Sequence, residues 1–260
     1  MIKRIIFTAV LWVFTSTVFA QNLYQIPSHW DNFVIRNLGV DDGITSQQIY
    51  NIHQDEDGFI WIVSNRQLLR YDGLKFRAFD KGNIGGTLYG LIEDSDGTMW
   101  IPSIGAGLYS FNGDSLKSYS SSSGDLVKAI EIRIDTLYLG MYGDGLKLFY
   151  QDSVIAHYTV DDGLVGDEVW TIEKDSSGNF WIGTNSGLSY FDGKTFTNFT
   201  TENGLPYNNI RSIEVLENGE VWVGTDKEGI VVFEGLIPTK YFNEQNGLQS
   251  GIITSDRKST

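Results

Sequence analysis

The chain has 260 residues, of which 41% are hydrophobic and 13% aromatic, with 29 glycines, 4 prolines and no cysteine. Its 33 acidic and 19 basic residues give a formal net charge of −14. Such a surface repels phosphate backbones and anionic headgroups, so we expect no nucleic-acid partner. The lack of cysteine excludes disulfides and thiol chemistry. Many glycines and aromatic residues with few prolines predict an all-β fold of short strands and tight turns.

The first twenty residues have the pattern of a secretory signal peptide. Lys3 and Arg4 precede an apolar stretch over 5–14, and a small residue, Ala20, ends the segment. This order predicts cleavage after Ala20 and a periplasmic or extracellular mature protein over 21–260. The apolar stretch is too short to cross a bilayer, and no later segment has eighteen consecutive apolar residues. We therefore expect no membrane span in this chain.

After the leader, a unit of about forty residues occurs five times. Each unit carries an aromatic anchor inside an apolar strand, and successive anchors stand 39, 38, 43 and 41 residues apart. The anchors are Trp61, Trp100, Tyr138, Trp181 and Trp222. The units span about 47–79, 87–119, 126–158, 168–199 and 209–242, and a further unit begins at 251–254. A fixed period of this length is typical of solenoids and propellers.

Each unit has the pattern of four antiparallel strands. An Asp-x-x-Gly turn precedes the anchor, as at 175–178, and a second turn precedes a closing aromatic strand, as at 196–199. Both turns are typical of tight hairpins. The anchor strand is apolar on both alternating faces, since Phe59 and Trp61 point one way and Ile60 the other. Both faces of that strand must therefore be covered by neighbouring sheets.

These features predict an all-β fold, a β-propeller of four-stranded antiparallel blades. Five blade repeats are intact, and partial strands stand at both ends, over 33–38 and 251–254. The sequence is compatible both with closure into a small propeller and with an incomplete, open arc. An open arc would leave apolar end faces and strand edges exposed.

The fourth unit carries the fullest motif. Asp-x-x-Gly-x-Phe-Trp-Ile-Gly-Thr runs over 175–184, Gly-Leu-Ser-Tyr-Phe-Asp-Gly follows at 187–193, and the linker Asn-Gly-Leu-Pro-Tyr-Asn-Asn-Ile occupies 203–210. Together these segments resemble the two-component regulator propeller repeat. The resemblance extends from about residue 31 to the C-terminus, with related linkers at 42–44, 162–164 and 246–248.

The resemblance implies a role in signal recognition. Such repeats form the periplasmic sensing portion of hybrid histidine kinases in Bacteroidota, whose ligands are often glycans, and some relatives are secreted proteins without a kinase. Because this chain has no kinase motif and no output domain, we expect a fragment of a longer sensor. Its expected partners are an oligosaccharide or other small extracellular ligand, and a protein partner or a self-dimer through the parent sensor. The alternatives are a surface or secretion-associated protein-interaction scaffold and a polysaccharide lyase or hydrolase.

The candidate ligand-binding face carries the segments that vary between units. In a four-stranded antiparallel blade, the linkers between blades and the loops between the second and third strands lie on the same face. Variable loops on a repeated scaffold are a usual place for recognition. The candidate residues in these segments are Arg66, Tyr142, Asp144, Asn185, Tyr207, Asn208 and Lys227.

One position of the innermost strand strengthens this expectation. Aligning the units by an apolar pair, such as Val169 and Ile172, places one aromatic or cationic residue per unit at the same position, at separations of 39, 39, 42 and 41. These residues are Tyr50, Tyr89, Lys128, Trp170 and Arg211. Around a propeller axis they would form a ring suited to stacking on sugars and to pairing with uronate or sulfate groups. The alternative is that this position packs against the next blade.

No motif indicates a metal, a cofactor or a catalytic group. The Asp-x-Asp-Gly segments at 55–58 and 94–97 lack the glutamate of a calcium loop and fit structural turns. The histidines share no repeat position and show no metal-ligand spacing; they are His29, His53 and His157. A nucleophile elbow and a phosphate-binding loop are absent, and no carboxylate pair stands out for glycoside hydrolysis. We therefore expect a non-catalytic protein that needs no cofactor.

Overall fold

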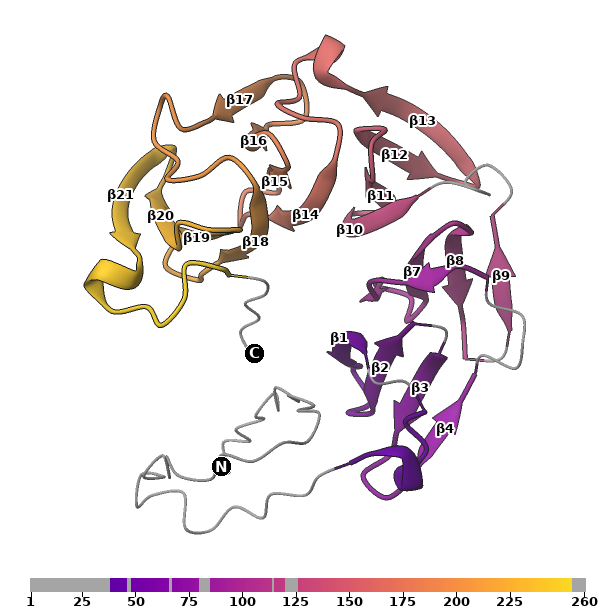
Figure 1. The fold of residues 1–260 in the computed structure, drawn as a ribbon. Helices are drawn as coiled ribbons and strands as arrows, with labels where there is room; N and C mark the ends of the chain where they lie inside the picture. The colour runs from indigo at the N-terminus through magenta and orange to yellow at the C-terminus, as the bar shows by residue number, and fades with distance from the viewer. Residues whose placement is uncertain are drawn as a thin grey trace, which may run out of the picture.

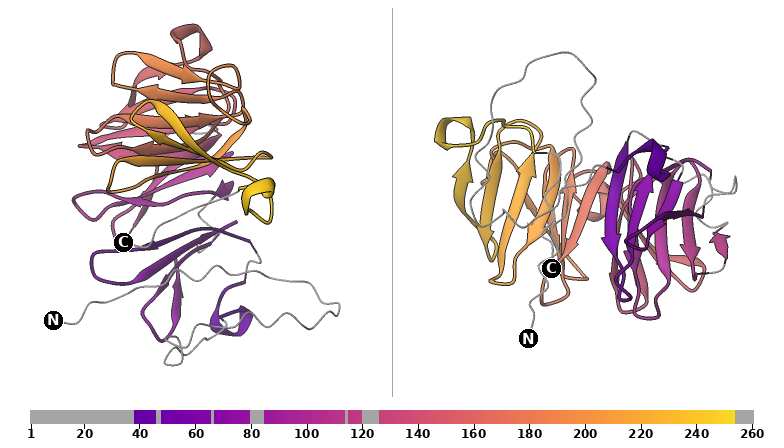
Figure 2. Two further views of the ribbon diagram at one scale, coloured as in Figure 1. Left: turned by 90° about the vertical axis from the view of Figure 1, so that its left-hand side faces the viewer. Right: turned by 90° about the horizontal axis from the view of Figure 1, so that it is seen from below.

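A computed structural model describes residues 38–45, 48–65, 67–79, 85–113, 115–119 and 126–253. The leader, the segment at 33–37, His29, Arg66 and Thr254 lie outside these residues. Five antiparallel sheets form an arc of blades around a common axis (Figure 1). Seen from below, the strands run along that axis and the blades stand side by side (Figure 2). The predicted all-β propeller of four-stranded blades is thereby confirmed.

In each blade the strands follow one another from the axis outward, in chain order. The first blade contains β1 (Ile49–Gln54), β2 (Ile60–Ser64), β3 (Gln67–Tyr71) and β4 (Phe76–Ala78). The second contains β5 (Thr87–Leu88), β6 (Ile92–Glu93), β7 (Met99–Ile104), β8 (Gly107–Phe111) and β9 (Leu116–Ser118). The third contains β10 (Val127–Arg133), β11 (Thr136–Met141), β12 (Leu146–Tyr150) and β13 (Ser153–Tyr158).

The last two blades have the same order. The fourth contains β14 (Val169–Lys174), β15 (Phe180–Thr184), β16 (Leu188–Phe191) and β17 (Phe196–Phe199). The fifth contains β18 (Ile210–Val215), β19 (Glu220–Thr225), β20 (Ile230–Glu234) and β21 (Ile237–Phe242). The innermost strands, which include β1, β10, β14 and β18, face the axis (Figure 1).

The linkers between blades use their Asp-Gly-Leu motif in a defined way. In the linker after β13, a 3-10 turn, η4 (Val160–Asp162), is closed by a carboxylate oxygen of Asp162 that accepts from Thr159 N at 2.9 Å. Gly163 then adopts φ 101°, in the left-handed region that favours glycine, and Leu164 is 2% exposed. Equivalent 3-10 turns are η2 (Val40–Asp42) and η5 (Glu244–Asn246). Where this motif occurs it turns the chain, and the apolar residue after its glycine is buried at Ile44 and Leu164.

The core lies between the blades. Trp181 is 2% exposed and packs its ring 5.3 Å from that of Phe233 on the next blade. Trp61 packs 5.6 Å from Phe111 in the same way, and its Nε1 donates to Asp55 Oδ2 at 2.7 Å. The Asp-x-x-Gly turn thus holds the anchor indole by a charge-assisted hydrogen bond while the ring fills the space between sheets. Tyr138 is buried, and Trp100 and Trp222 are half-buried.

Residues 251–253 pack on the fifth blade as the innermost strand of the fifth blade packs on the fourth. Ile253 N donates to Thr225 O at 3.0 Å, and a Cβ on Gly224 would meet Ile253 Cγ2 at 2.5 Å. Gly183 stands in the same relation to Ile210, at 2.6 Å. The described residues 251–253 form no strand, and the unit expected at 251–254 stays a prediction.

Candidate functional site

The five residues expected to form a ring lie side by side around the axis. The rings of Tyr50 and Tyr89 have centroids 4.5 Å apart, and Lys128 Nζ lies 4.5 Å from the centroid of Tyr89. Lys128 Nζ also lies 4.1 Å from the centroid of Trp170, and the guanidinium carbon of Arg211 lies 4.1 Å from it. We call this continuous series of five side chains the axial stack. Each member contacts its neighbour on the next blade. The same side chains therefore both pack between blades and line the axis.

A β-bulge positions the members of the axial stack. In the fourth blade Val169 opposes Thr184 and Thr171 opposes Gly183, which leaves Trp170 without a partner residue on β15. The same register shift occurs between β1 and β2, β10 and β11, and β18 and β19. It leaves unpaired, in that order, Tyr50, Lys128 and Arg211. Because a bulge bends the strand and re-aims the extra side chain, the repeat directs one residue per blade to the same level of the axis.

The second blade reaches this arrangement through a proline. Pro102 on β7 has no N–H to donate to the innermost strand, which is interrupted between β5 and β6. Tyr89 lies in that interruption, and its own N–H donates to Pro102 O at 3.2 Å. Three residues, 89–91, again oppose two, 101–102, because Leu88 pairs with Ser103 and Ile92 with Trp100. The extra residue is thus kept although the strand is broken.

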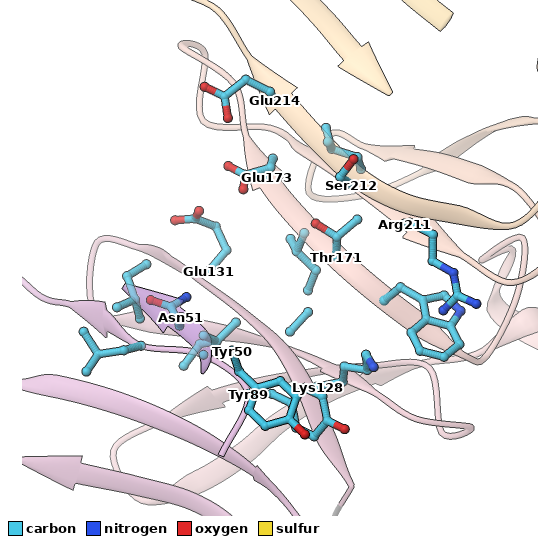
Figure 3. Close-up of a pocket in the computed structure, with 18 of the residues that line it drawn as sticks. Tyr50, Asn51, Tyr89, Lys128, Glu131, Thr171, Glu173, Arg211, Ser212 and Glu214 are labelled. Carbon is cyan, nitrogen blue, oxygen red and sulfur yellow. The ribbon is translucent and has the colours of Figure 1, made fainter. Parts of the chain in front are cut away.

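The axial stack lines one end of a cavity of about 370 Å³ (Figure 3). Next to each stack member on the innermost strands stands a small or short residue, and this keeps the middle of the cavity open. These residues are Asn51, Gly90, Ala129, Thr171 and Ser212. The volume falls in the range of about 300–1,000 Å³ that is usual for small-molecule sites.

The two cations of the axial stack differ in their surroundings. The Arg211 guanidinium is held by Asp226, with Nε to Oδ1 at 3.0 Å and Nη2 to Oδ2 at 3.2 Å. Lys128, in contrast, has no ion pair among the described residues. Burial, reinforced by the nearby charge of Arg211 and opposed by Glu168, lowers the pKa of Lys128 to about 8. Arg211 is therefore neutralised, and Lys128 is a poorly solvated amine that faces the cavity.

The opposite end of the cavity is acidic, which the sequence analysis missed. Glu131, Glu173 and Glu214 stand three residues after Lys128, Trp170 and Arg211 on the same strands, and they line the far end of the cavity (Figure 3). Their separations of 42 and 41 residues follow the repeat period and were visible in the sequence.

A histidine and a glutamate also meet at the cavity. His53 on β1 lines it, and His53 Nε2 lies 3.1 Å from Glu93 Oε2 on β6. Both side chains are mostly buried, at 26% and 14% exposure. The two residues come from adjacent blades, so their pairing could not be read from a common repeat position.

The variable loops contribute unequally. Tyr142 meets Trp170 edge-on, with centroids 5.5 Å apart, so it extends the axial stack, and hydrogen bonding to Glu168 raises the pKa of its hydroxyl. Lys227 Nζ lies 5.2 Å from the ring of Tyr207 in the neighbouring linker. Hydrogen bonding to Tyr207 raises the pKa of Lys227. Of these three candidates, Tyr142 contacts the axial stack, while Lys227 and Tyr207 contact each other.

The remaining loop candidates are engaged in the loops themselves. Asp144 Oδ2 pairs with Lys147 at 2.8 Å and Oδ1 with His157 at 3.2 Å. Asn185 Oδ1 accepts from Ser186 Oγ at 3.0 Å, and Asn208 Oδ1 accepts from Thr201 N at 2.7 Å. No hydrogen bond or ring contact joins these three residues to the axial stack. Arg66 lies outside the described residues.

The described residues contain no group of three or more His, Cys, Asp or Glu side chains able to hold a metal ion. In the Asp-x-Asp-Gly turns the first aspartate is fully used: Asp94 Oδ1 accepts from Asp96 N and Thr98 N, and Oδ2 accepts from Trp100 Nε1. In the part of the chain that is described, no helix is both long and apolar enough to cross a membrane.

The fold matches solved extracellular sensor domains. An extracellular domain assigned to a hybrid two-component system of B. thetaiotaomicron is 21% identical, with a TM-score of 0.69, and the match covers 79% of this chain and 29% of that one. An extracellular domain assigned to a one-component system of the same organism is 18% identical, with a TM-score of 0.64, covering 76% and 31%. The chain thus spans about a third of the length of these two proteins.

A third solved structure is an enzyme. Virginiamycin B lyase from Staphylococcus aureus is 15% identical, with a TM-score of 0.64, and the match covers 75% of this chain and 70% of the lyase. At these identities the likeness describes the fold and not the activity. No curated protein sequence gave a match.

The family comparison concerns the repeats themselves. The profile described as "Two component regulator propeller" matches residues 43–66, 163–186 and 204–227. Each match begins in a linker and ends just after the anchor strand, so it covers the turn glycine, the bulge and the anchor of the first, fourth and fifth blades. Three segments of the chain, in the first, fourth and fifth blades, are therefore similar to the two-component regulator propeller repeat.

Proposed function

We propose that this chain is a non-catalytic ligand-recognition propeller, the input region of an extracellular or periplasmic sensor, and that it binds an oligosaccharide at the axial stack. The observation that carries the proposal is the continuous contact of five side chains, one from each blade, along a cavity of about 370 Å³. Three matches to the sensor-propeller repeat support it.

The chemistry of the axial stack suits a sugar. Aromatic faces such as those of Trp170 and Tyr89 bind the apolar C–H face of a pyranose, while charged groups at the rim bind its hydroxyls. Glu131, Glu173 and Glu214 add acceptors at the other end of the cavity. A carbohydrate is the ligand class that uses both kinds of contact at once.

The sensor role refers to a longer protein. The solved sensor domains extend over about three times the matched length, so the signalling output and the kinase belong to a parent protein in this proposal. The proposed partners of this region are its ligand and, through the parent, a second copy or another protein.

A lyase is the second candidate, and it is favoured by one observation, the pairing of His53 with Glu93 at the cavity wall. A buried histidine oriented by a carboxylate is a general base in many enzymes. The two candidates differ in outcome: a sensor returns the oligosaccharide intact, whereas a lyase forms an unsaturated product that absorbs near 230 nm. The His53→Ala variant would abolish such a product and leave binding in place.

The deciding experiment is a glycan array probed with the full chain, followed by titration calorimetry of the bound glycans. Trp170→Ala should weaken binding at least tenfold, because the ring that contacts both cations of the axial stack is lost. Tyr241→Ala is the matched control, since Tyr241 is an exposed aromatic residue on the outermost strand β21. Near-UV circular dichroism of both variants reports folding. Absence of any array binding, or equal affinity of the wild type and Trp170→Ala, would overturn the proposal.

A further inference from the structure

The axial stack contains two donors without acceptors. Lys128 Nζ lies over the rings of Tyr89 and Trp170 and makes no hydrogen bond or ion pair among the described residues. The indole Nε1 of Trp170 is buried and has no hydrogen-bond partner there either. A buried donor without an acceptor is unfavourable, and buried donors are almost always satisfied in folded proteins. Trp170 Nε1 is such a buried donor, and the partly exposed ammonium of Lys128 lies over the same ring, so the two together indicate a missing acceptor.

Arg211 does not share this property. Its guanidinium donates from two nitrogens to the two carboxylate oxygens of Asp226, and its flat face lies on Trp170. The pair fixes the side chain and gives the guanidinium a carboxylate partner, so Arg211 ends the axial stack without an unpaired donor at these two nitrogens. The unbalanced positive charge of the axial stack therefore belongs to Lys128.

The glutamates at the far end of the cavity make its two ends differ in charge. Glu131, Glu173 and Glu214 stand three residues further along their strands, which corresponds to about 10 Å at 3.3 Å per residue. Glu131 Oε1 pairs with Lys174 Nζ at 3.3 Å, but the three carboxylates outnumber this one cation, so this end repels an anion and attracts hydroxyl groups. An anionic group can therefore be accommodated at the Lys128 end only.

From these observations we infer that the axial stack is an anion-binding subsite, in which Lys128 Nζ and Trp170 Nε1 hold a carboxylate or sulfate group of the ligand. The ligand is thus an acidic oligosaccharide, with its charged group beside Lys128 Nζ and Trp170 Nε1 and its hydroxyls toward the three glutamates. This inference rests on the proposed function, from which it takes the saccharide part of the ligand. Lys128 is its specificity-determining residue.

The first test separates acidic from neutral ligands on the full chain. The array carries uronate-containing glycans, their neutral methyl esters, and sulfated and unsulfated forms of the same oligosaccharides. We expect binding to uronate or sulfated forms at least tenfold tighter than to their neutral counterparts. The comparison of the two acidic sets identifies the charged group. Equal binding of charged and neutral forms would overturn the inference and leave the oligosaccharide proposal standing.

The second test uses small anions alone. Sodium glucuronate and sodium sulfate are titrated, at constant ionic strength, into the wild type, Lys128→Met and Lys194→Met, with glucose as the neutral probe. Lys194 is an exposed lysine in the β16–β17 turn and is the matched control. We expect saturable anion binding in the wild type and Lys194→Met, and at least a tenfold loss in Lys128→Met.

The two tests together distinguish the two proposals. Anion binding that depends on Lys128, without any glycan binding, would support the subsite and overturn the oligosaccharide proposal. Glycan binding that Lys128→Met leaves unchanged would support the oligosaccharide proposal and overturn the anion-binding subsite. Absence of both would overturn both.

Discussion

The ammonium of Lys128 lies 4.1 Å from the ring centroid of Trp170, and the guanidinium of Arg211 lies at the same distance from it. Two cations thus flank one indole from adjacent blades, and only Arg211 has a carboxylate partner. Cation–π contacts offset part of the desolvation of Lys128, by about 0.5–2 kcal/mol each. An amine kept in this position is unfavourable for the free protein, and an anionic ligand would relieve it.

Ligand binding should depend on pH through Lys128. Burial and the charge of Arg211 lower its pKa to about 8, while Glu168 acts in the opposite direction, and Tyr89 and Trp170 present only ring faces. Below pH 7 the amine is charged and affinity for an acidic ligand should be constant. Above the free protein's pKa of about 8, affinity should fall about tenfold per pH unit, and it should level off above the pKa of the complex. Calorimetry between pH 6 and 10 measures this; a flat profile, or the same profile in Lys128→Met, would contradict it.

Lys128→Met should stabilise the protein at neutral pH while it weakens anion binding. The folded-state pKa of about 8 lies below the ordinary value of 10.5, so the unfolded chain binds the proton more tightly between these values. The resulting penalty is complete below pH 8 and disappears as the pH rises toward 10.5. With half of the side chain exposed, we expect a gain of about 1–2 kcal/mol at pH 7. Urea unfolding at pH 7 and pH 10 checks it, with Lys194→Met expected to be neutral at both.

The repeat pattern predicted the fold and which residues of the innermost strands occupy equivalent positions. The anchors and the Asp-x-x-Gly turns recur at nearly constant spacing, and each has the same physical task in each blade, so their geometry repeats as well. The alignment of Val169 and Ile172 with their equivalents was sufficient to bring five residues of the axial stack together. The bulge that directs these side chains could not be predicted. A register shift is a property of the pairing of two strands, and the sequence of one strand does not show it.

Contacts between residues at non-equivalent positions of the repeat could not be predicted from the sequence either. Arg211 and Asp226 come from an innermost strand and a loop of the same blade, and His53 and Glu93 come from different blades. None of these pairs occupies a position shared by all units, so no periodic signal marks them. The three glutamates of the acidic end did have such a signal, at three residues after the stack position.

Gly183 should be essential for packing between the fourth and fifth blades. A Cβ at this position would lie 2.6 Å from Cγ2 of the fully buried Ile210 and 2.7 Å from Thr171 Cγ2. Gly183→Ala should therefore lower the free energy of unfolding by about 1–3 kcal/mol. Gly39→Ala is the control, since a Cβ there meets nothing within 4 Å and Gly39 has an extended φ of −149°. A destabilisation of Gly183→Ala no larger than that of Gly39→Ala would show that the blades separate easily.

Ile134 should be replaceable with a gain in stability. It forms, with Asp135, the two-residue turn between β10 and β11, where it has φ 57° and is 84% exposed. A β-branched residue is unfavourable in this left-handed conformation, which glycine adopts freely. Ile134→Gly should raise the free energy of unfolding by about 1 kcal/mol. The control is Leu74→Gly, at an equally exposed turn position (83%) without a positive φ, where glycine should bring no gain. Urea unfolding compares the two variants, and equal effects would mean that the turn at Ile134 stores no strain.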